Sequence, residues 1–317
     1  MSPSNRPGKK VEDIELKKVE SLDSFVRSYW KAGGFTAKKI ADGVDILERM
    51  VKRKECVTFF SFPACIVATG LRGIIRELVE RKLVDVVVTT CGTLDHDLAR
   101  CWKDYYHGSF DMDDATLREE NVSRLGNVLL PDESYGLVLE ERLQPILEKM
   151  WKEGIRKIST KDLAWYLGKE TENKNSILYW AEKNKIPVFV PGITDGAVGY
   201  QLWSFWQEHK DFTIDIFQDE KDLSDIVFEA KETGGLMIGG GISKHHTMWW
   251  NQFKGGLDYV VFITTAQEFD GSLSGARIRE GISWGKISPK ARKVTIDGDA
   301  TVVLPLLTAP LLERLEG

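Results

Sequence analysis

Apolar runs rich in Val, Ile and Phe alternate with amphipathic stretches along most of the chain. Apolar runs of this kind are typical of strands that are buried on both faces, as in a parallel sheet between helices. Residues 36–52 have the spacing of an amphipathic helix, and Thr36 is placed to cap its N-terminus. Strands are predicted at 57–60, 84–90, 187–190, 212–217, 236–238, 259–263 and 294–296, with amphipathic stretches at 71–82 and 94–102.

This alternation predicts a doubly wound α/β fold, in which a mostly parallel, Rossmann-like sheet carries helices on both faces. No repeat or Pro/Gly-rich linker divides residues 36–317, so we interpret them as a single domain. Residues 1–35 are polar at their start and are interpreted as an N-terminal arm. Residues 131–185 are rich in Lys and Glu and are interpreted as a helical insertion. Helices are predicted there at 135–151, 161–167 and 176–183.

Composition narrows the possible functions. The chain has 317 residues and a hydrophobic fraction of 42%, which is ample for a buried core. Its net charge of -5 gives no electrostatic footprint for nucleic acid or an anionic membrane. No apolar run approaches a membrane span and no signal peptide is recognisable, so a cytoplasmic protein is expected. The four cysteines form no CxxC pair, so neither a disulfide framework nor a zinc site is expected.

Four loops after predicted strands combine glycine with small polar or acidic residues: 89–97, 192–199, 239–246 and 266–275. Ligands bind beyond the carboxyl ends of the strands in a doubly wound sheet, so these loops are the expected site. The triplet Gly239–Gly241 precedes a predicted helix near Ser243, whose free N–H groups would suit a phosphate. A glycine triplet alone is more often a tight turn, and the usual dinucleotide fingerprint is absent after the first strand.

Lys286 is the candidate nucleophile. It ends the segment 266–286 and follows a tryptophan and a glycine. An amine attacks carbon only when it is neutral, and an aromatic neighbour that excludes water would help it lose its proton. The spacing alone is weak evidence, because most lysines are solvated at the surface.

Two histidines, His245 and His246, together with the acidic cluster 95–97, also suggest a metal site. Adjacent histidines on a helix point about 100° apart, so both rarely bind one ion. We therefore expect no catalytic metal.

Several long segments of the sequence closely resemble motifs of the deoxyhypusine synthase family. They are TTCGTLDHDLARC, RLGNVLLP, PGITDGAVG, GGGISKHH and AQEFDGSLSGARIREGISWGK, in that order, within a match from about Phe59 to Leu307. The resemblance implies an NAD-dependent transferase that moves the aminobutyl group of spermidine to a lysine of translation initiation factor 5A. It further implies an imine intermediate on Lys286, with His245 taking a proton from the substrate amine, and a homotetramer with interfacial active sites.

The resemblance also assigns binding positions. For the substrate these are Trp284, Glu280, His96, Gly271 and Ser272. For NAD they are Gly239, Gly240, Thr90, Asp195, Thr265, Ala266, Asp270, Ser274, Asp299 and Ala300. Family members cover an active-site entrance with an N-terminal arm, and residues 11–19 are either a remnant of that arm or a frayed tail.

The match departs from the family's eukaryotic pattern in the polyamine site. Acidic anchor positions there are His96, Tyr200 and Leu273 here, and an amide position is Trp249. The loop 63–68 also lacks matching Ser and Asn positions for NAD. The site could therefore bind another polyamine, or use Asp95, Asp97 and Glu280 instead. Two further alternatives stay open: transfer to a free diamine, as in homospermidine synthesis, and an NAD-binding oligomer without transferase activity.

Overall fold

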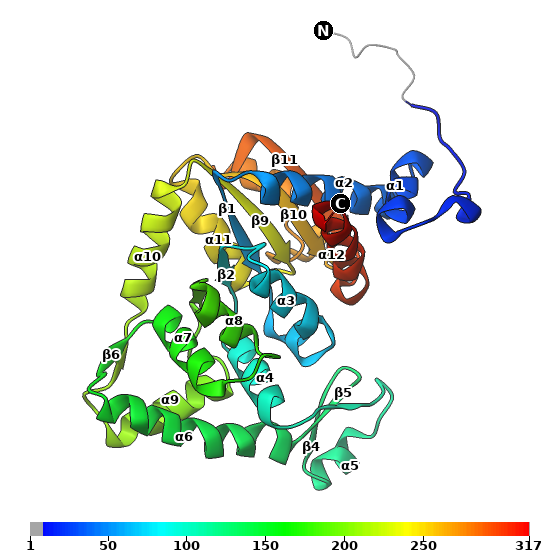
Figure 1. Ribbon diagram of the computed structural model, residues 1–317. Coiled ribbons are helices and arrows are strands. Elements are labelled where there is room, and N and C mark those ends of the chain that lie inside the picture. The colour runs from blue at the N-terminus through cyan, green and yellow to red at the C-terminus, as the bar shows by residue number, and fades with distance from the viewer. Residues whose placement is uncertain (1–8, 317) are drawn as a thin grey trace.

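The computed structural model describes residues 9–316, and a six-stranded sheet forms its centre (Figure 1). The strands are β1 (Cys56–Ser61), β2 (Val86–Val88), β3 (Tyr106–His107), β4 (Val122–Leu125), β5 (Val128–Pro131), β6 (Lys157–Ile158), β7 (Val188–Phe189), β8 (Thr213–Ile214), β9 (Glu232–Ile238), β10 (Leu257–Thr264) and β11 (Ile287–Asp297). The helices are α1 (Leu22–Ala32), α2 (Phe35–Lys52), α3 (Leu71–Glu80), α4 (Cys91–Trp102), α5 (Asp114–Glu119), α6 (Gly136–Lys152), α7 (Thr160–Thr171), α8 (Ile177–Asn184), α9 (Ala197–Glu208), α10 (Ile216–Glu229), α11 (Ile242–Gln252) and α12 (Ala300–Glu316).

All strands of the central sheet run parallel, in the order β11-β10-β9-β1-β2-β7. The chain builds outward from β1 through β2 to β7 and then returns to place β9 on the other side of β1. The strand order therefore reverses between β1 and β9, which is the position where open α/β sheets bind ligands. Because the strands are parallel, their carboxyl ends all meet at one edge of the sheet.

Alternate side chains of each strand supply apolar cores on the two faces of the sheet. Phe60 and Val261 face α2 and α12, where a Cβ on Gly43 of α2 would lie 2.8 Å from a methyl group of Leu307. Phe59 packs on the other side with Val227 of α10, in a core that also receives Trp250 of α11. Helices thus cover both faces, and the predicted doubly wound, mostly parallel fold is confirmed.

Most predicted elements form, with two exceptions. Residues 212–217 were expected to be one strand, but only Thr213–Ile214 is extended, and it pairs with β6 outside the central sheet. The chain turns there because Asp215 caps α10 by accepting a hydrogen bond from the backbone N–H of Gln218. Thr36 was expected to cap α2, but Gly34 occupies the N-cap position and no side chain caps that end.

The helices predicted within residues 131–185 are confirmed as α6, α7 and α8. Figure 1 shows α6 together with α5, β4 and β5 at the opposite end of the molecule from α1 and α2. The small antiparallel sheet β3-β5-β4 was not predicted. That residues 131–185 are an insertion stays a prediction.

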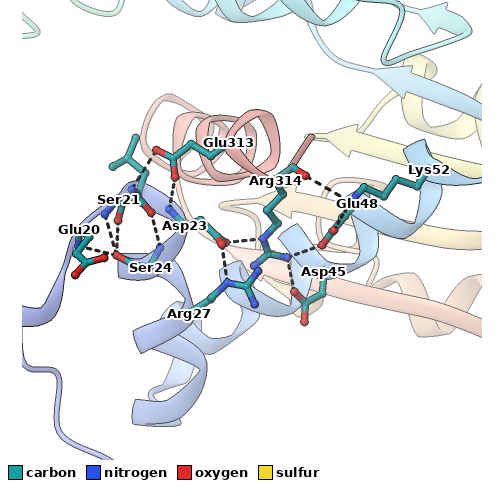
Figure 2. Close-up of polar contacts among 11 residues, drawn as sticks. Glu20, Ser21, Asp23, Ser24, Arg27, Asp45, Glu48, Lys52, Glu313 and Arg314 are labelled. Carbon is teal, nitrogen blue, oxygen red and sulfur yellow. Dashed lines mark hydrogen bonds and ion pairs between the residues drawn. The ribbon is translucent and has the colours of Figure 1, made fainter. Parts of the chain in front are cut away.

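Part of the predicted N-terminal arm packs onto the domain as α1. Figure 2 shows Arg314 of α12 between Asp23 of α1 and two carboxylates of α2, Asp45 and Glu48. The Arg314 side chain is only 5% exposed, so these ion pairs are poorly screened by water. Glu313 also accepts hydrogen bonds from the first backbone N–H groups of α1. The predicted arm begins in residues 1–8, which lie outside the described residues, and its covering role stays a prediction.

Within residues 9–316, no helix combines the length and the apolar character that a bilayer span requires.

Candidate active site

The backbone of Lys286 is fixed from both sides before β11 begins. Its N–H donates to Gly281 O at 2.9 Å, and its own carbonyl accepts from Leu257 N at 3.1 Å. Gly285, directly before it, has φ of 69°, a left-handed conformation that a residue with a Cβ rarely adopts. The turn therefore needs the glycine of the SWGK motif, and it presents the lysine side chain beside β10.

His245, on the first turns of α11, lies beside this lysine. Its Nε2 is 3.4 Å from Lys286 Nζ. The Lys286 ammonium also lies 5.1 Å from the centroid of the Trp284 ring. On its own helix, His245 stacks on Trp249 with ring centroids 5.8 Å apart. The three residues predicted for the chemistry, Lys286, His245 and Trp284, are thus brought together from segments about forty positions apart.

These side chains line a cavity of about 320 Å³. Its lining comprises Lys244, His245, Met248, Trp249, Leu273, Ala276, Arg277, Glu280, Gly281, Trp284 and Lys286. The wall is largely apolar and aromatic, and Glu280 supplies its one carboxylate. Such a cavity suits a long aliphatic amine, which needs apolar surface for its methylenes and a carboxylate or aromatic face for its ammonium groups.

Charge in the cavity favours a neutral imidazole. Burial lowers the pKa of His245, and the nearby Lys286 ammonium lowers it further. The ring is therefore uncharged near neutral pH and can accept a proton through the nitrogen that faces Lys286.

The residues predicted to hold NAD lie on loops at one edge of the sheet. They follow five different strands: Thr90 after β2, Asp195 after β7, Gly239 and Gly240 after β9, Thr265, Ala266, Asp270 and Ser274 after β10, and Asp299 and Ala300 after β11. Two of these loops touch directly, because a Cβ on Gly240 would lie 2.2 Å from Ser274 N. Thr90 also joins two loops, since its Oγ1 accepts a hydrogen bond from Ala64 N after β1.

The N-terminus of α11 offers groups that fit a dinucleotide. Its N-cap is Gly241, with φ of 79°, and no side chain caps this end. The first N–H groups of such a helix attract a phosphate. Ser243 Oγ is buried there without a hydrogen-bond partner among residues 9–316. Asp195, Asp270 and Asp299 are carboxylates of the kind that accept from ribose hydroxyls, so the donor set fits NAD.

The predicted substrate residues divide into two groups. Glu280 and Trp284 line the cavity, and Gly271 and Ser272 directly precede Leu273, which also lines it. His96 does not line it. It is buried on α4, where its Nδ1 lies 3.0 Å from the Tyr105 hydroxyl and where burial lowers its pKa to about 4. A contact between His96 and substrate stays a prediction.

Asp95 and Asp97 flank His96 and serve as helix caps. Asp95 accepts hydrogen bonds from Ala197 N and Val198 N at the start of α9, both at 2.8 Å. Asp97 accepts hydrogen bonds from Ile177 N and Leu178 N at the start of α8. Both carboxylates are at most 1% exposed, so neither is free to anchor an amine. Of the three alternative carboxylates, only Glu280 lines the cavity.

The two adjacent histidines have separate partners. His246 Nε2 lies 3.1 Å from Glu220 of α10, whereas His245 faces Lys286. Within residues 9–316, no group of three or more His, Cys, Asp or Glu side chains is arranged to hold a metal ion.

Lys244 lines the cavity and was missed from the sequence. It is the third residue of α11, close to the positive end of the helix dipole, where a cation is unfavourable. The sequence feature that could have indicated a role for Lys244 is a lysine near a helix N-terminus, directly before two histidines.

The chain is similar to known proteins over nearly its whole length. The family model for deoxyhypusine synthase matches residues 24–311. A probable deoxyhypusine synthase of Picrophilus torridus is 56% identical over 96% of this chain and 97% of the relative. One from Thermoplasma volcanium is 55% identical over the same shares. A crystal structure of a putative deoxyhypusine synthase from Entamoeba histolytica has the same fold, with a TM-score of 0.65 at 20% identity, over 96% of this chain and 97% of that one. The chain therefore belongs to the deoxyhypusine synthase family and is a transferase.

Proposed function

We propose that this protein transfers the aminobutyl group of spermidine to a lysine of translation initiation factor 5A in the cytoplasm, through an imine on Lys286. The observation that carries the proposal is the contact between Lys286 and a neutral His245 in a cavity that also holds Trp284 and Glu280. The family supports the reaction type, and the cavity supports an aliphatic amine as the substrate.

Each step has a residue of this chain to perform it. Glu280 binds one ammonium group of the polyamine, while Trp249 and Trp284 cover its methylenes or face a second ammonium group. His245 accepts a proton from the substrate amine or from Lys286, which must be neutral to attack. Lys286 then expels 1,3-diaminopropane from the activated carbon and holds the aminobutyl group as an imine. The loops around Gly239 and Asp299 would hold NAD, which would supply the reversible hydride transfer that oxidises the amine before this attack and reduces the product afterwards.

Imines hydrolyse, so the working site must exclude water. In a single chain, Trp284 is 64% exposed and Trp249 is 42% exposed, which leaves the cavity open. We therefore propose a homotetramer in which a second copy covers the cavity. Exposed aromatic residues on α9, Tyr200, Trp203 and Trp206, add apolar surface that such an assembly would bury.

The test is intact mass after incubation with NAD and spermidine and trapping with borohydride. Wild type should gain one aminobutyl group and Lys286→Ala should gain none. Lys290→Ala, which removes an exposed lysine of β11, is the matched control and should gain the group.

An adduct on Lys286→Ala would place the imine on another residue. No adduct on wild type, with NAD shown to be bound, would instead favour an oligomer without transferase activity. The acceptor is identified by offering translation initiation factor 5A and putrescine together with labelled spermidine. Label that enters only homospermidine would replace the protein acceptor by a free diamine.

A further inference from the structure

Lys244 is a buried cation at the base of the cavity, and the proposed reaction leaves it without a role. Its side chain is among the largest that are fully buried, and the residue is 2% exposed. Nζ donates to Leu273 O at 2.6 Å and to Ala276 O at 2.8 Å, and it lies 3.8 Å from the centroid of the Phe262 ring. Among residues 9–316 its hydrogen-bond partners are these two carbonyls and no carboxylate. Burial of an ammonium group costs free energy, which its two carbonyl partners and one aromatic face offset only in part. The presence of a lysine at this position therefore calls for an explanation.

The two carbonyls belong to the segment 271–276, which is part of the loop after β10. They lie on either side of Ser274, a residue predicted to bind NAD. Thr264 Oγ1 also donates to Ser274 O at 2.8 Å. The segment contributes Leu273 and Ala276 to the cavity wall, and Lys244 comes from the helix that carries His245. One side chain therefore joins the helix that carries His245 to another part of the cavity lining.

We propose that Lys244 is a positioning residue whose ammonium group holds the segment 271–276 against α11, and so fixes the cavity wall that faces His245 and Lys286. The proposal rests on the proposed function of this site. In it, Lys244 acts through the segment 271–276, whose carbonyls it holds. Without the ammonium group, the part-buried carbonyls of Leu273 and Ala276 lose this partner, and the segment moves away from the helix to bind water instead.

The same contact makes the position sensitive to alkaline pH. Burial lowers the pKa of Lys244 to about 8; Glu280 opposes this shift, and Arg277 adds to it. The other titratable groups on this cavity are His245 and Lys286. The charge that strengthens both hydrogen bonds is thus lost as pH rises through about 8, well below the pKa of a solvated lysine.

The experiment compares Lys244→Met with wild type, with Lys244→Arg as the charged variant and Lys290→Met as the exposed control. The readouts are the melting temperature, the rate of borohydride-trapped adduct formation, KM for spermidine, and amide hydrogen exchange of residues 271–276. For Lys244→Met we expect a melting temperature close to that of wild type, because the removal of a buried charge offsets the lost hydrogen bonds. Adduct formation should slow about tenfold or more, with a raised KM and faster exchange confined to 271–276.

The adduct rate of wild type should fall as pH rises above about 8, and Lys244→Arg should restore part of the rate and abolish this fall, since a guanidinium stays charged. The inference fails if Lys244→Met keeps the wild-type rate, KM and exchange. If Lys244→Met does not fold, Lys244→Arg decides through its pH profile. If wild type itself forms no adduct, the proposed function fails, and hydrogen exchange of 271–276 still decides whether Lys244 holds the segment.

Discussion

Two polar clusters of this chain look equally able to carry chemistry in the sequence, and the structure separates them. Around α4, the carboxylates of Asp95 and Asp97 are buried and accept several short hydrogen bonds each, from backbone N–H groups and from Tyr135, Ser176 or Arg72. Around α11, His245 and Lys286 are only partly buried and meet each other at 3.4 Å across a cavity.

The difference lies in how far each group is satisfied. A carboxylate that accepts from several backbone and side-chain donors is held in place, and exchanging those donors for a ligand would cost the protein its helix caps. A lysine and an imidazole that line a cavity with few other partners are free to exchange protons with a substrate. Burial alone therefore does not single out the residues that we propose as catalytic, since the more deeply buried cluster caps helices.

The largest expected effects come from one substitution in each cluster, of which one removes stability and the other removes activity. Asp97→Ala should lower the free energy of unfolding by about 3 to 5 kcal/mol, because it leaves Arg72 as an uncompensated buried charge. Lys286→Ala should leave stability within roughly 0.5 kcal/mol and abolish adduct formation. Denaturant unfolding and the trapping assay measure both. An Asp97→Ala protein as stable as wild type would break the distinction between the two clusters.

His245→Gln should keep the fold and slow the transfer by roughly 10²- to 10⁴-fold, because glutamine cannot take up a proton. Single-turnover rates of adduct formation measure this. His246→Gln is the matched control, as its partner is Glu220 rather than Lys286. Equal losses in the two variants would mean that α11 is disturbed as a whole and that His245 has no special part.

The pH profile of wild type sharpens the assignment of the base. The pKa of His245 is lowered by burial, so its neutral form persists to a pH below the ordinary histidine value of 6.5. Activity should hold as pH falls to 6.5 and decline only below it, as the imidazole gains its proton. An acidic limb centred above 6.5, absent from His245→Gln, would contradict the lowered pKa.

The smallest effect is expected at the aromatic wall. Trp284→Leu keeps apolar contact but removes the ring face, a loss of about 0.5 to 1 kcal/mol at an exposed site, or a KM raised by less than about tenfold. Steady-state kinetics with spermidine measure it. Phe228→Leu on α10, which changes an exposed aromatic residue outside the cavity lining, is the control, and a larger rise of KM in that variant would move the binding surface to α10.

Local patterns predicted elements and their buried faces well. The apolar run 259–263 became β10, and the helices at 135–151 and 176–183 formed within two residues of their predicted ends. These patterns failed at the ends of elements, where a nearby residue took the capping position. Thr36 lost the capping position to Gly34, and Asp215 ended the predicted strand 212–217 by starting a helix. A helix cap depends on a single residue, and neighbouring residues can compete for it. The ends of helices and strands are therefore predicted less well than the elements themselves.

The sequence by itself determined the parallel sheet and the glycine-rich loops at its carboxyl edge, because these depend on periodicity and on residues that are adjacent in the chain. The pair Lys286 and His245 was predicted through the resemblance of the SWGK and KHH segments to the family. Only the tertiary structure decided which polar residues are caps and which face a cavity. Asp97 meets Ile177 across 80 positions and Lys244 meets Leu273 across 29, and no local pattern records such contacts. The physical reason is that a side chain's protonation and freedom are set by the groups packed around it, which the fold brings from distant segments.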